Sequence, residues 1–319
     1  MTNDVLSDVL RAVRLTGAIY FDLELHSPWV AEAPASADIA GIVMPGAQRV
    51  LEYHVVARGG CWAHAIGQDP RRMQEGDLIA FPQGDPHVIS SAPGLRGKPD
   101  LEQYRRSGSL PIVYEMGGGG PDRARVICGF LGFDDRPFNP LIASLPRMIH
   151  LPAAGAGHGW LRGLLDVVLA ESESARAGRD DVLARLSELM FVEMVRRYLE
   201  GLPPGETGWL AGLRDDLVGR ALGALHARPR EDWTVESLAR DVGASRSVLA
   251  ERFTAMVGQP PMQYLTLWRM QLASRLLADG GQVAAVADAV GYASEAAFSR
   301  AFKKIVGQPP RDWRQRSAR

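Results

Sequence analysis

Short apolar runs separated by turns rich in glycine and proline occupy residues 48–133. Four such runs lie at residues 50–57, 61–66, 78–81 and 112–116. Runs of this length, bounded by clusters of Gly, Pro and Asp, are typical of strands. Strands at this spacing predict an all-β barrel or sandwich. The polar, glycine-containing segment 91–110 is expected to form a loop between two of them.

After Pro152 the apolar residues recur every three to four positions instead of every two. Residues 160–171 and 180–199 both show this spacing, with Leu183, Leu186 and Met190 as examples. The period predicts two helices. The stretch 201–205, GLPPG, ends the second helix because proline and glycine interrupt helices, and it marks a domain boundary. The apolar stripes of these helices have two candidate partners, the barrel and a second copy of the chain.

The C-terminal third contains an internal repeat. The pentapeptide VGQPP at residues 257–261 recurs at residues 306–310, an offset of 49. The match extends outwards, because Phe253 pairs with Phe302 and Leu249 pairs with Phe298 at the same offset. Further upstream the offset becomes 48, which pairs Ala239 with Ala287 and Gly243 with Gly291. Two copies are too few for a solenoid, so the pattern indicates a duplicated small module.

Each copy has the content of a helix-turn-helix module. A short helix, expected at residues 236–242 and 283–290, carries a small residue four positions before the glycine. The glycine permits the left-handed backbone of a tight turn between helices. Ser245 and Ser294 are placed to cap a second helix, whose large apolar side chains lie four apart. In such modules the second helix enters the DNA major groove.

The second helices leave polar side chains on their outer faces. These are Arg246, Ser247 and Glu251 in the first module, and Glu295, Ser299, Arg300 and Lys303 in the second. Residues 262–277 between the modules have apolar residues at helical spacing, which predicts one rigid helix. Such a helix would fix the separation of the two second helices, which is about 34 Å if they enter adjacent major grooves on one face of the DNA. The alternative is two helical hairpins that only pack together. A tandem pair with the same ending favours DNA binding.

The charge of the chain is unevenly distributed. Residues 213–319 carry 16 Lys and Arg against 11 Asp and Glu, a net charge of +5. Residues 1–212 carry 20 against 26, a net charge of −6. A basic C-terminal third behind an acidic front is the distribution expected of a DNA-binding domain fused to another domain.

The C-terminal part of the sequence resembles the AraC/XylS family of bacterial transcription regulators. The first matching stretch runs from Ser237 to Phe253, and the second, more specific one reads VADAVGYASEAAFSRAFKK at residues 286–304. The resemblance covers about 100 residues and implies contacts to base edges from Ser247, Ala250, Glu251, Glu295, Ala296 and Arg300. Ala250 has no hydrogen-bonding side chain, whereas a Glu at 251 can accept from cytosine N4. The predicted DNA-binding set leaves out Ala250 and adds five polar residues near the starts and on the outer faces of the two helices. It consists of Ser245, Arg246, Ser247, Glu251, Ser294, Glu295, Ala296, Ser299, Arg300 and Lys303.

Residues 76–87, GDLIAFPQGDPH, fit the second of the two motifs of cupins, a glycine followed by Pro-x-Gly and a histidine at fixed spacing. The first cupin motif is incomplete: Glu52 lies seven residues before Gly59, but no His-x-His precedes it. His54 lies two residues after Glu52 and hence on the same face of its strand. Residues 45–135 therefore resemble the cupin-type sensor domains that accompany AraC-type DNA-binding domains.

Three side chains are candidates to converge inside the barrel. His54, His87 and Cys128 offer imidazole and thiolate ligands that suit zinc or another late transition metal, and Cys61 and His64 are further candidates. His54, His87 and Trp62 are the candidate effector-binding residues. The alternative is that these residues are ordinary barrel-interior side chains, since buried cysteines behave as small hydrophobes. The side chains of Trp62 and Trp160 are interpreted as parts of the core or of the cavity wall, and not as an aromatic ligand-binding box.

The composition agrees with two domains in a reducing compartment. A length of 319 residues is typical of about two domains, and two cysteines do not suit a disulfide-stapled secreted fold. The N-terminal segment lacks the apolar stretch of a secretory signal, and no run approaches the ~18 apolar residues of a membrane span. We therefore expect a cytoplasmic α+β protein of three parts: a cupin-like β-barrel sensor domain at residues 1–150, a helical connector at 151–205, and an all-α tandem helix-turn-helix domain at 213–319.

Three functions compete for this architecture. The leading hypothesis is a sequence-specific transcription regulator, not an enzyme, whose barrel senses a small effector or a metal ion. The second is a metal-dependent cupin enzyme with a vestigial DNA-binding domain, which a complete first motif would favour. The third is an architectural DNA binder, which would not need a barrel. The resemblance implies double-stranded DNA, a small effector, a second copy of the chain and RNA polymerase as partners.

Overall fold

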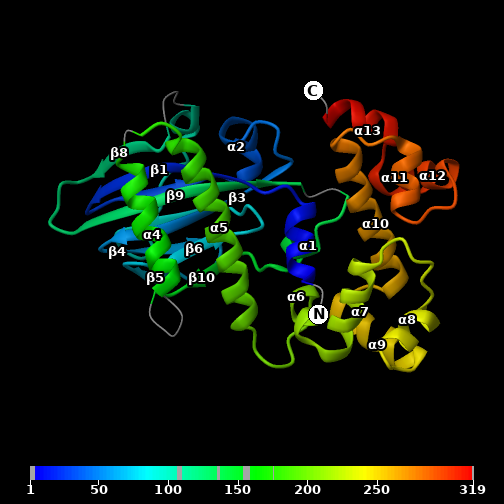
Figure 1. Cartoon of the computed structure of the whole chain (residues 1–319). Helices are drawn as coiled ribbons and strands as arrows, with labels where there is room; N and C mark the ends of the chain where they lie inside the picture. Colours follow the sequence, from blue (N-terminus) through cyan, green and yellow to red (C-terminus); the bar gives the residue numbers. More distant parts are fainter. Residues whose placement is uncertain (1–3, 106–109, 135–136, 154–158, 175, 318–319) are drawn as a thin grey trace. The chain divides into compact units, whose positions relative to one another are not determined.

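The computed structural model describes residues 4–105, 110–134, 137–153, 159–174 and 176–317, and the chain divides into two compact units (Figure 1). The β unit comprises Leu15–Asp134 and Leu145–Gly201. The helical unit comprises the chain before Leu15, residues 137–144 and the chain from Leu202 onward. This two-domain α+β architecture was the fold class expected from the sequence, and each unit is described by itself below.

The β unit contains ten strands and four helices within the described residues. The strands are β1 (Thr16–His26), β2 (Val30–Ala33), β3 (Arg49–Arg58), β4 (Gly60–Ala65), β5 (Arg71–Gln74), β6 (Leu78–Phe81), β7 (His87–Ser90), β8 (Ile112–Gly117), β9 (Arg123–Phe133) and β10 (Ile149–Leu151). The helices are α2 (Ser36–Val43), the 3₁₀ helix η1 (Leu101–Arg105), α4 (Gly159–Ser172) and α5 (Arg179–Glu200). The four predicted strands correspond to β3, β4, β6 and β8, and the two predicted helices to α4 and α5, so both predictions are confirmed.

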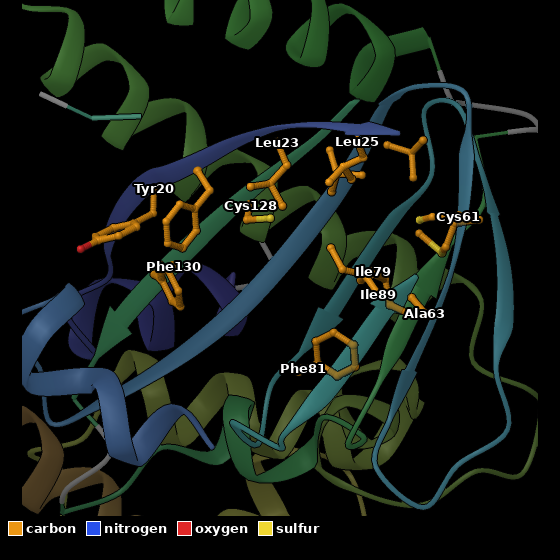
Figure 2. Packing of buried hydrophobic residues seen from close by; sticks show 14 of the residues in the cluster. Tyr20, Leu23, Leu25, Cys61, Ala63, Ile79, Phe81, Ile89, Cys128 and Phe130 are labelled. Atoms are coloured by element: carbon orange, nitrogen blue, oxygen red, sulfur yellow. The ribbon is translucent and has the colours of Figure 1, made fainter. Parts of the chain in front are cut away.

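The strands form two sheets that share one core. The larger sheet has the order β10-β6-β3-β9-β1-β8, and the smaller has the order β2-β7-β4-β5. Apolar side chains from both sheets pack in a single buried cluster. Figure 2 shows Leu23, Cys128, Phe130 and Phe81 of the larger sheet and Ile89 of the smaller one among these side chains. Because side chains alternate along a strand, every second residue of β1, β3 and β9 points into this shared interior.

Helix α5 covers the opposite face of the larger sheet. Met190, Phe191 and Met194 of α5 lie against Leu51 and Tyr53 of β3. The hydroxyl of Tyr53 is hydrogen-bonded to that of Ser187 at 2.7 Å. Strand β3 is therefore buried on both faces, with Leu51 and Tyr53 under the helix and Glu52 and His54 in the interior.

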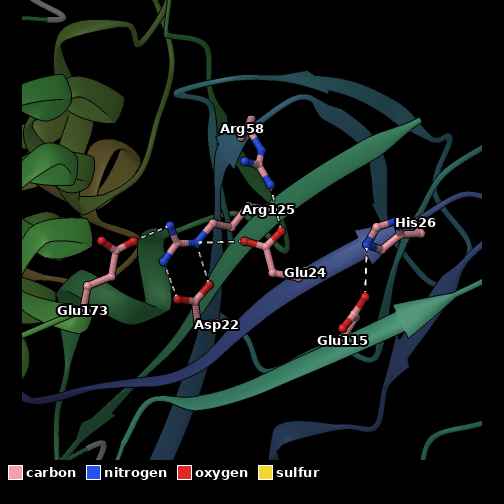
Figure 3. A network of polar contacts seen from close by, with 7 residues as sticks. All are labelled: Asp22, Glu24, His26, Arg58, Glu115, Arg125 and Glu173. Carbon is pink, nitrogen blue, oxygen red and sulfur yellow. Dashed lines mark hydrogen bonds and ion pairs between the residues drawn. The ribbon is translucent and has the colours of Figure 1, made fainter. Parts of the chain in front are cut away.

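A charged network lies on the outer face of β1 and β9 (Figure 3). Arg125 of β9 contacts both carboxylate oxygens of Asp22 at 2.6 and 2.9 Å, and it contacts Glu173 beyond α4 at 2.8 Å. Glu24, two residues along β1, lies 3.6 Å from the same guanidinium. The hydrogen bond to Asp22 raises the pKa of Arg125. The polar face of β1 is thereby tied to its neighbour strand and to the end of α4.

The segment expected to be a loop contributes to the core. Within residues 91–110, η1 buries Tyr104, which is 3% exposed. The hydroxyl of Tyr20 donates a hydrogen bond to the backbone oxygen of Tyr104 at 2.6 Å. The loop interpretation is therefore wrong for this turn, because one aromatic residue anchors a polar stretch. Residues 106–109 of the segment lie outside the described residues.

The helical unit consists of α1 (Val5–Ala12), α3 (Pro140–Ser144), α6 (Trp209–Arg214), α7 (Asp216–Ala227), α8 (Val235–Asp241), α9 (Arg246–Val257), α10 (Pro261–Ala278), α11 (Val283–Ala289), α12 (Glu295–Val306) and α13 (Pro310–Ser317). Helix α1 belongs here by its contacts. The side-chain amide of Gln271 donates to the carbonyl of Ala12 at 2.9 Å and accepts from the backbone N–H of Phe138 at 3.1 Å. The sequence interpretation assigned all of residues 1–150 to the barrel, whereas packing groups α1 and α3 with the helical unit.

Candidate functional site

The first helix-turn-helix module is formed by α8 and α9. Gly243, in the turn between them, has φ +72°, as the sequence predicted. The hydroxyl of Ser245 caps α9 by accepting from the backbone N–H of Val248 at 3.3 Å. Leu249 and Phe253 are fully buried. The predicted turn, cap and inner face of this module are confirmed.

The second module repeats this arrangement in α11 and α12. Gly291 has φ +78°, and a Cβ atom there would lie 2.6 Å from the backbone oxygen of Arg230, so the position requires glycine. The hydroxyl of Ser294 accepts from the backbone N–H of Ala297 at 3.2 Å. Phe298 and Phe302 are fully buried. The repeated VGQPP ends α9 and α12 at its glycine and starts α10 and α13 at its last proline.

Helix α10 connects the two modules as the predicted single helix. Its N-terminal half buries Tyr264 against Phe253 of α9, with ring centroids 5.8 Å apart. Its C-terminal half supplies Met270, Ala273 and Leu277 to the core of the second module. One continuous helix thus belongs to both cores and fixes the modules to each other within the helical unit.

The predicted DNA-binding residues lie on the outer faces of α9 and α12. Glu295 and Ser299 are half-buried, and the other eight residues of the set are exposed: Ser245, Arg246, Ser247, Glu251, Ser294, Ala296, Arg300 and Lys303. In the first module Arg246 is paired with Glu236 of α8 at 2.7 Å. In the second, the side chains of Arg300 and Lys303 make no ion pair or hydrogen bond with any described residue. The second helix therefore presents two uncommitted cations. The exposed Val248 of α9 was not in the set; its apolar side chain suits contact with a thymine methyl group.

The interior of the β unit contains a small cavity at the predicted sensor position. It has a volume of about 40 Å³ and is lined by His54 and His87, with Cys128 beside them. Glu52 and Tyr104, which were not among the predicted site residues, also line it. Trp62 does not line it: it alternates with the buried Cys61 and Ala63 on β4, and its ring packs against Arg72 at 5.8 Å. His64 shares that face of β4 with Trp62, whereas Cys61 lies in the core.

A chain of contacts runs through the cavity residues. The Sγ atom of Cys128 lies 2.9 Å from His54 Nδ1, and His54 Nε2 lies 2.7 Å from His87 Nε2. His87 Nδ1 lies 3.0 Å from the backbone oxygen of Asp85. A carbonyl oxygen can only accept, so His87 Nδ1 carries the proton and its Nε2 has a free lone pair. His54 Nε2 then donates to His87, and the Cys128 thiol donates to His54 Nδ1.

Strand pairing explains why these residues meet. His54 of β3 is directly opposite Cys128 of β9, and Glu52 lies two residues earlier on the same face of β3. His87 begins β7 in the smaller sheet, after the Pro-x-Gly corner, and its ring stacks on Phe81 at 3.7 Å between centroids. The two sheets therefore bring their polar residues together across the shared core.

Burial sets the protonation of the cavity residues in the absence of a counter-charge. It raises the pKa of Glu52 to about 8 and the pKa of the Cys128 thiol well above its usual range. It lowers the pKa of His87 to about 4 and lowers the pKa of His54 well below its ordinary value. At neutral pH the four side chains are therefore uncharged as they stand.

Glu52, His54 and His87 are the cavity residues able to hold a cation together. Each offers one ligand atom, and these atoms all lie within 4.8 Å of one another. Cys128 faces the other nitrogen of His54. The Glu52 position could have been found from the sequence, because the remnant of the first cupin motif and the two-residue spacing to His54 both point to it. No sequence signal identifies Tyr104.

Fold and site together define a transcription regulator with a cupin-type domain in front of a tandem helix-turn-helix domain. A family described as "Cupin" matches residues 4–200, and one described as "Helix-turn-helix domain" matches residues 238–316. An AraC-like transcription regulator of Streptomyces lividans is 35% identical over 321 residues, covering 98% of both chains. The HTH-type transcriptional regulator AlkR of Acinetobacter baylyi is 30% identical, covering 98% of this chain and 100% of the relative. This chain belongs to the AraC-like transcription regulators, as its motifs indicated.

Solved structures of the same kind have lower overall similarity. ToxT from Vibrio cholerae is 11% identical, with a TM-score of 0.34 over 96% of this chain and 98% of that chain. An AraC-type regulator domain from Chromobacterium violaceum is 26% identical, with a TM-score of 0.32 over 34% of this chain and 97% of that chain. Among the described residues, no helix is both long and apolar enough to cross a membrane.

Proposed function

We propose that this regulator binds a specific duplex DNA sequence by placing α9 and α12 in adjacent major grooves. The observation that carries the proposal is the structural equivalence of the two modules on one continuous helix, α10. Arg300 reads a base edge, since Arg is the usual bidentate partner of guanine, and Lys303 contacts phosphate. The ten residues of the predicted DNA-binding set, which lie within residues 245–251 and 294–303, form the surface that contacts DNA.

The cavity of the β unit is proposed to be the sensing site. A small effector or a metal ion binds beside His54 and His87 and alters DNA binding by the helical unit. The polar side chains of this cavity are buried in a core that otherwise consists of apolar residues, which is typical of a ligand site. The protein performs no chemistry on DNA; it acts through recognition alone, and it is not an enzyme.

The protein is further proposed to act in the cytoplasm as a homodimer that contacts RNA polymerase. Helices α4 and α5 support the dimer, because Trp160, Val167, Val182 and Leu189 are large apolar residues exposed along them. The interpretation of Trp160 as core or cavity wall is wrong, since this residue is 51% exposed. Exposed apolar side chains of this kind are typical of interaction surfaces.

Selection from a random duplex library tests the DNA proposal. The full chain is incubated with the library at moderate salt, and bound DNA is recovered and sequenced over several rounds. We expect enrichment of one motif with two conserved segments about one helical turn apart. The double variant Arg300→Ala, Lys303→Ala is carried in parallel and should lose the segment read by α12. Failure of the wild-type chain to enrich any motif would contradict the proposal.

A further inference from the structure

Three buried side chains, Glu52, His54 and His87, place one ligand atom each within 4.8 Å of one another, close enough to share a metal ion. His54 Nε2 and His87 Nε2 are 2.7 Å apart, Oε1 of Glu52 lies 3.8 Å from His54 Nε2, and Oε2 of Glu52 lies 3.7 Å from His87 Nε2. Ligand atoms about 2.0–2.1 Å from a tetrahedral zinc ion are roughly 3.4 Å from each other. The imidazole nitrogens are closer together than this value and each carboxylate oxygen is farther from its histidine, so the two rings must separate and one oxygen of Glu52 must approach both nitrogens to enclose an ion.

The lone pairs of both imidazoles can point at this position. His87 is held in the required tautomer, because its Nδ1 donates to the carbonyl of Asp85 and leaves Nε2 free. His54 reaches the same state when its proton lies on Nδ1, since Nδ1–H can then donate a hydrogen bond to the Sγ atom of Cys128. A second partner that orients a histidine ligand in this way is a regular feature of metal sites.

The carboxyl group of Glu52 is buried, and one of its oxygens lacks a hydrogen-bond partner within the described part of the chain, a role that a cation could fill. Its side chain is 3% exposed, and its Oε2 atom has no hydrogen-bond partner among the described residues. A buried, unsatisfied carboxyl oxygen is costly, and a cation at this position would satisfy it.

The cavity has the size of an ion with its water. A volume of about 40 Å³ holds on the order of three water molecules, whereas pockets for organic ligands usually measure ~300 Å³ or more. A three-residue ligand set also leaves a coordination position open for water or a small exogenous ligand.

We propose that Glu52, His54 and His87 together bind one divalent transition-metal ion, preferentially Zn²⁺, through a carboxylate oxygen and the two Nε2 atoms. Cys128 is a positioning residue whose Sγ atom accepts a hydrogen bond from the Nδ1–H group of His54, and it does not ligate the ion. This set replaces the expected set of His54, His87 and Cys128. Two histidines and one glutamate are a regular ligand set of zinc sites with an open position. The same donors also suit Fe²⁺, which is therefore the main competing cation.

The inference deepens the proposed sensing role of the cavity and rests on it only for its biological consequence. Metal binding is measured on the full chain without DNA. A negative result here therefore leaves the outcome of the DNA selection untouched, and a failed DNA selection leaves the metal result untouched.

The test combines metal content with a spectroscopic reading of the ligands. The full chain, freed of any affinity tag, is stripped with chelator and titrated with Zn²⁺, and bound metal is counted by mass spectrometry of inorganic ions. We expect one ion per chain. Titration with Co²⁺ should give visible bands of a site with nitrogen and oxygen ligands, without the near-ultraviolet charge-transfer absorption of a cobalt–thiolate bond.

Variants separate the ligands from the positioning residue. Glu52→Gln and His87→Gln should each lower the affinity for Zn²⁺ by more than about 100-fold, whereas Cys128→Ser should lower it by about 10- to 100-fold and retain the stoichiometry. His26→Gln is the matched control, because His26 also lies beside a carboxylate, that of Glu115 at 3.3 Å, on the outer face of β1. It should bind like the wild type.

Circular dichroism checks that each variant is folded, and the wild-type stoichiometry and cobalt spectrum give a result even if one ligand variant does not fold. Three outcomes would overturn the proposal: a wild-type chain that binds no ion, a folded Glu52→Gln variant with unchanged affinity, or a cobalt–thiolate band that Cys128→Ser abolishes.

Discussion

Glu251 and Arg300 lie at equivalent positions of the two recognition helices and carry opposite charges. Each lies two residues before the buried phenylalanine of its helix, Phe253 in α9 and Phe302 in α12, and both are exposed. The same exposed position therefore carries an anion in the first module and a cation in the second. We infer that the second module supplies most of the electrostatic attraction and the first adds base discrimination.

Replacing Arg300 by alanine should weaken specific binding by ~1–3 kcal/mol and relax the preference at one base pair, since a bidentate contact to one base is lost. Binding to the selected site and to single-base variants of that site measures both effects. Arg71→Ala, the same change of charge at an exposed position of β5 in the β unit, is the control and should have no effect. A uniform loss of affinity with intact base preference would rule out base readout by Arg300.

Replacing Lys303 by alanine should have a different signature. A lysine that contacts phosphate adds affinity for every sequence alike, so all sites should weaken equally. The slope of log affinity against log salt concentration should decrease by about one. Titrations at several salt concentrations, on specific and random DNA, check this prediction; a change in base preference would argue against a phosphate contact.

Replacing Glu251 by glutamine should strengthen binding to random DNA at low salt by up to about fivefold, because unit charges 4 Å apart in water interact by about 1 kcal/mol. The gain should shrink as salt increases, since screening weakens the repulsion that the glutamate exerts on phosphate. Weaker binding at low salt together with a lost preference for cytosine would show instead that the net role of Glu251 is attractive.

Asp215 should be important for the placement of α9. One of its oxygens caps α7 by accepting from the backbone N–H groups of Leu217 and Val218 at 3.0 and 2.9 Å. The other contacts Arg252 of α9 at 2.6 and 2.9 Å. Asp215→Ala should lower the free energy of unfolding by about 1 kcal/mol through the lost cap. Asp215→Asn keeps a capping oxygen and should be milder; equal losses in urea unfolding would refute the capping role.

His226 should make the helical unit sensitive to acid. It stacks on Trp268, its Nε2 lies 2.8 Å from the hydroxyl of Tyr264, and its Nδ1 faces Asp8 of α1 at 3.7 Å. Burial lowers the pKa of His226 although Asp8 opposes the shift. The unfolded chain therefore takes up a proton at a higher pH than the folded one.

It follows that this contribution to stability is complete above the ordinary histidine pKa of about 6.5 and decreases as the pH falls below it. Urea unfolding followed by circular dichroism at pH 5.5 and 7.5 measures the effect. His226→Gln should reduce the difference between the two pH values. An unchanged difference in that variant would assign the acid sensitivity to other groups.

The recognition helices could be predicted from the sequence because their signals are local. Ser245 and Ser294 cap helices within three residues, and the buried apolar side chains of each helix lie one turn apart, so no tertiary information was needed. The duplication made the prediction stronger, since each module served as a check on the other.

The composition of the cavity could be predicted only in part, because it depends on strand pairing between distant segments. His54 meets Cys128 through the register of β3 and β9, and it meets His87 through the packing of two sheets. Residue spacing in the sequence does not determine which nitrogen of His54 faces Cys128 and which faces His87. Helix α1 was missed as part of the helical unit for the same reason, because Gln271, which binds its last turn, is 259 residues away.

Hydroxyl-radical footprinting of the full chain on its selected site tests most directly that both modules read DNA. The account predicts two protected tracts on one face of the duplex, with centres about 10 base pairs apart, and selective weakening of one tract in Arg300→Ala. A single protected tract, or protection that does not depend on the DNA sequence, would contradict it.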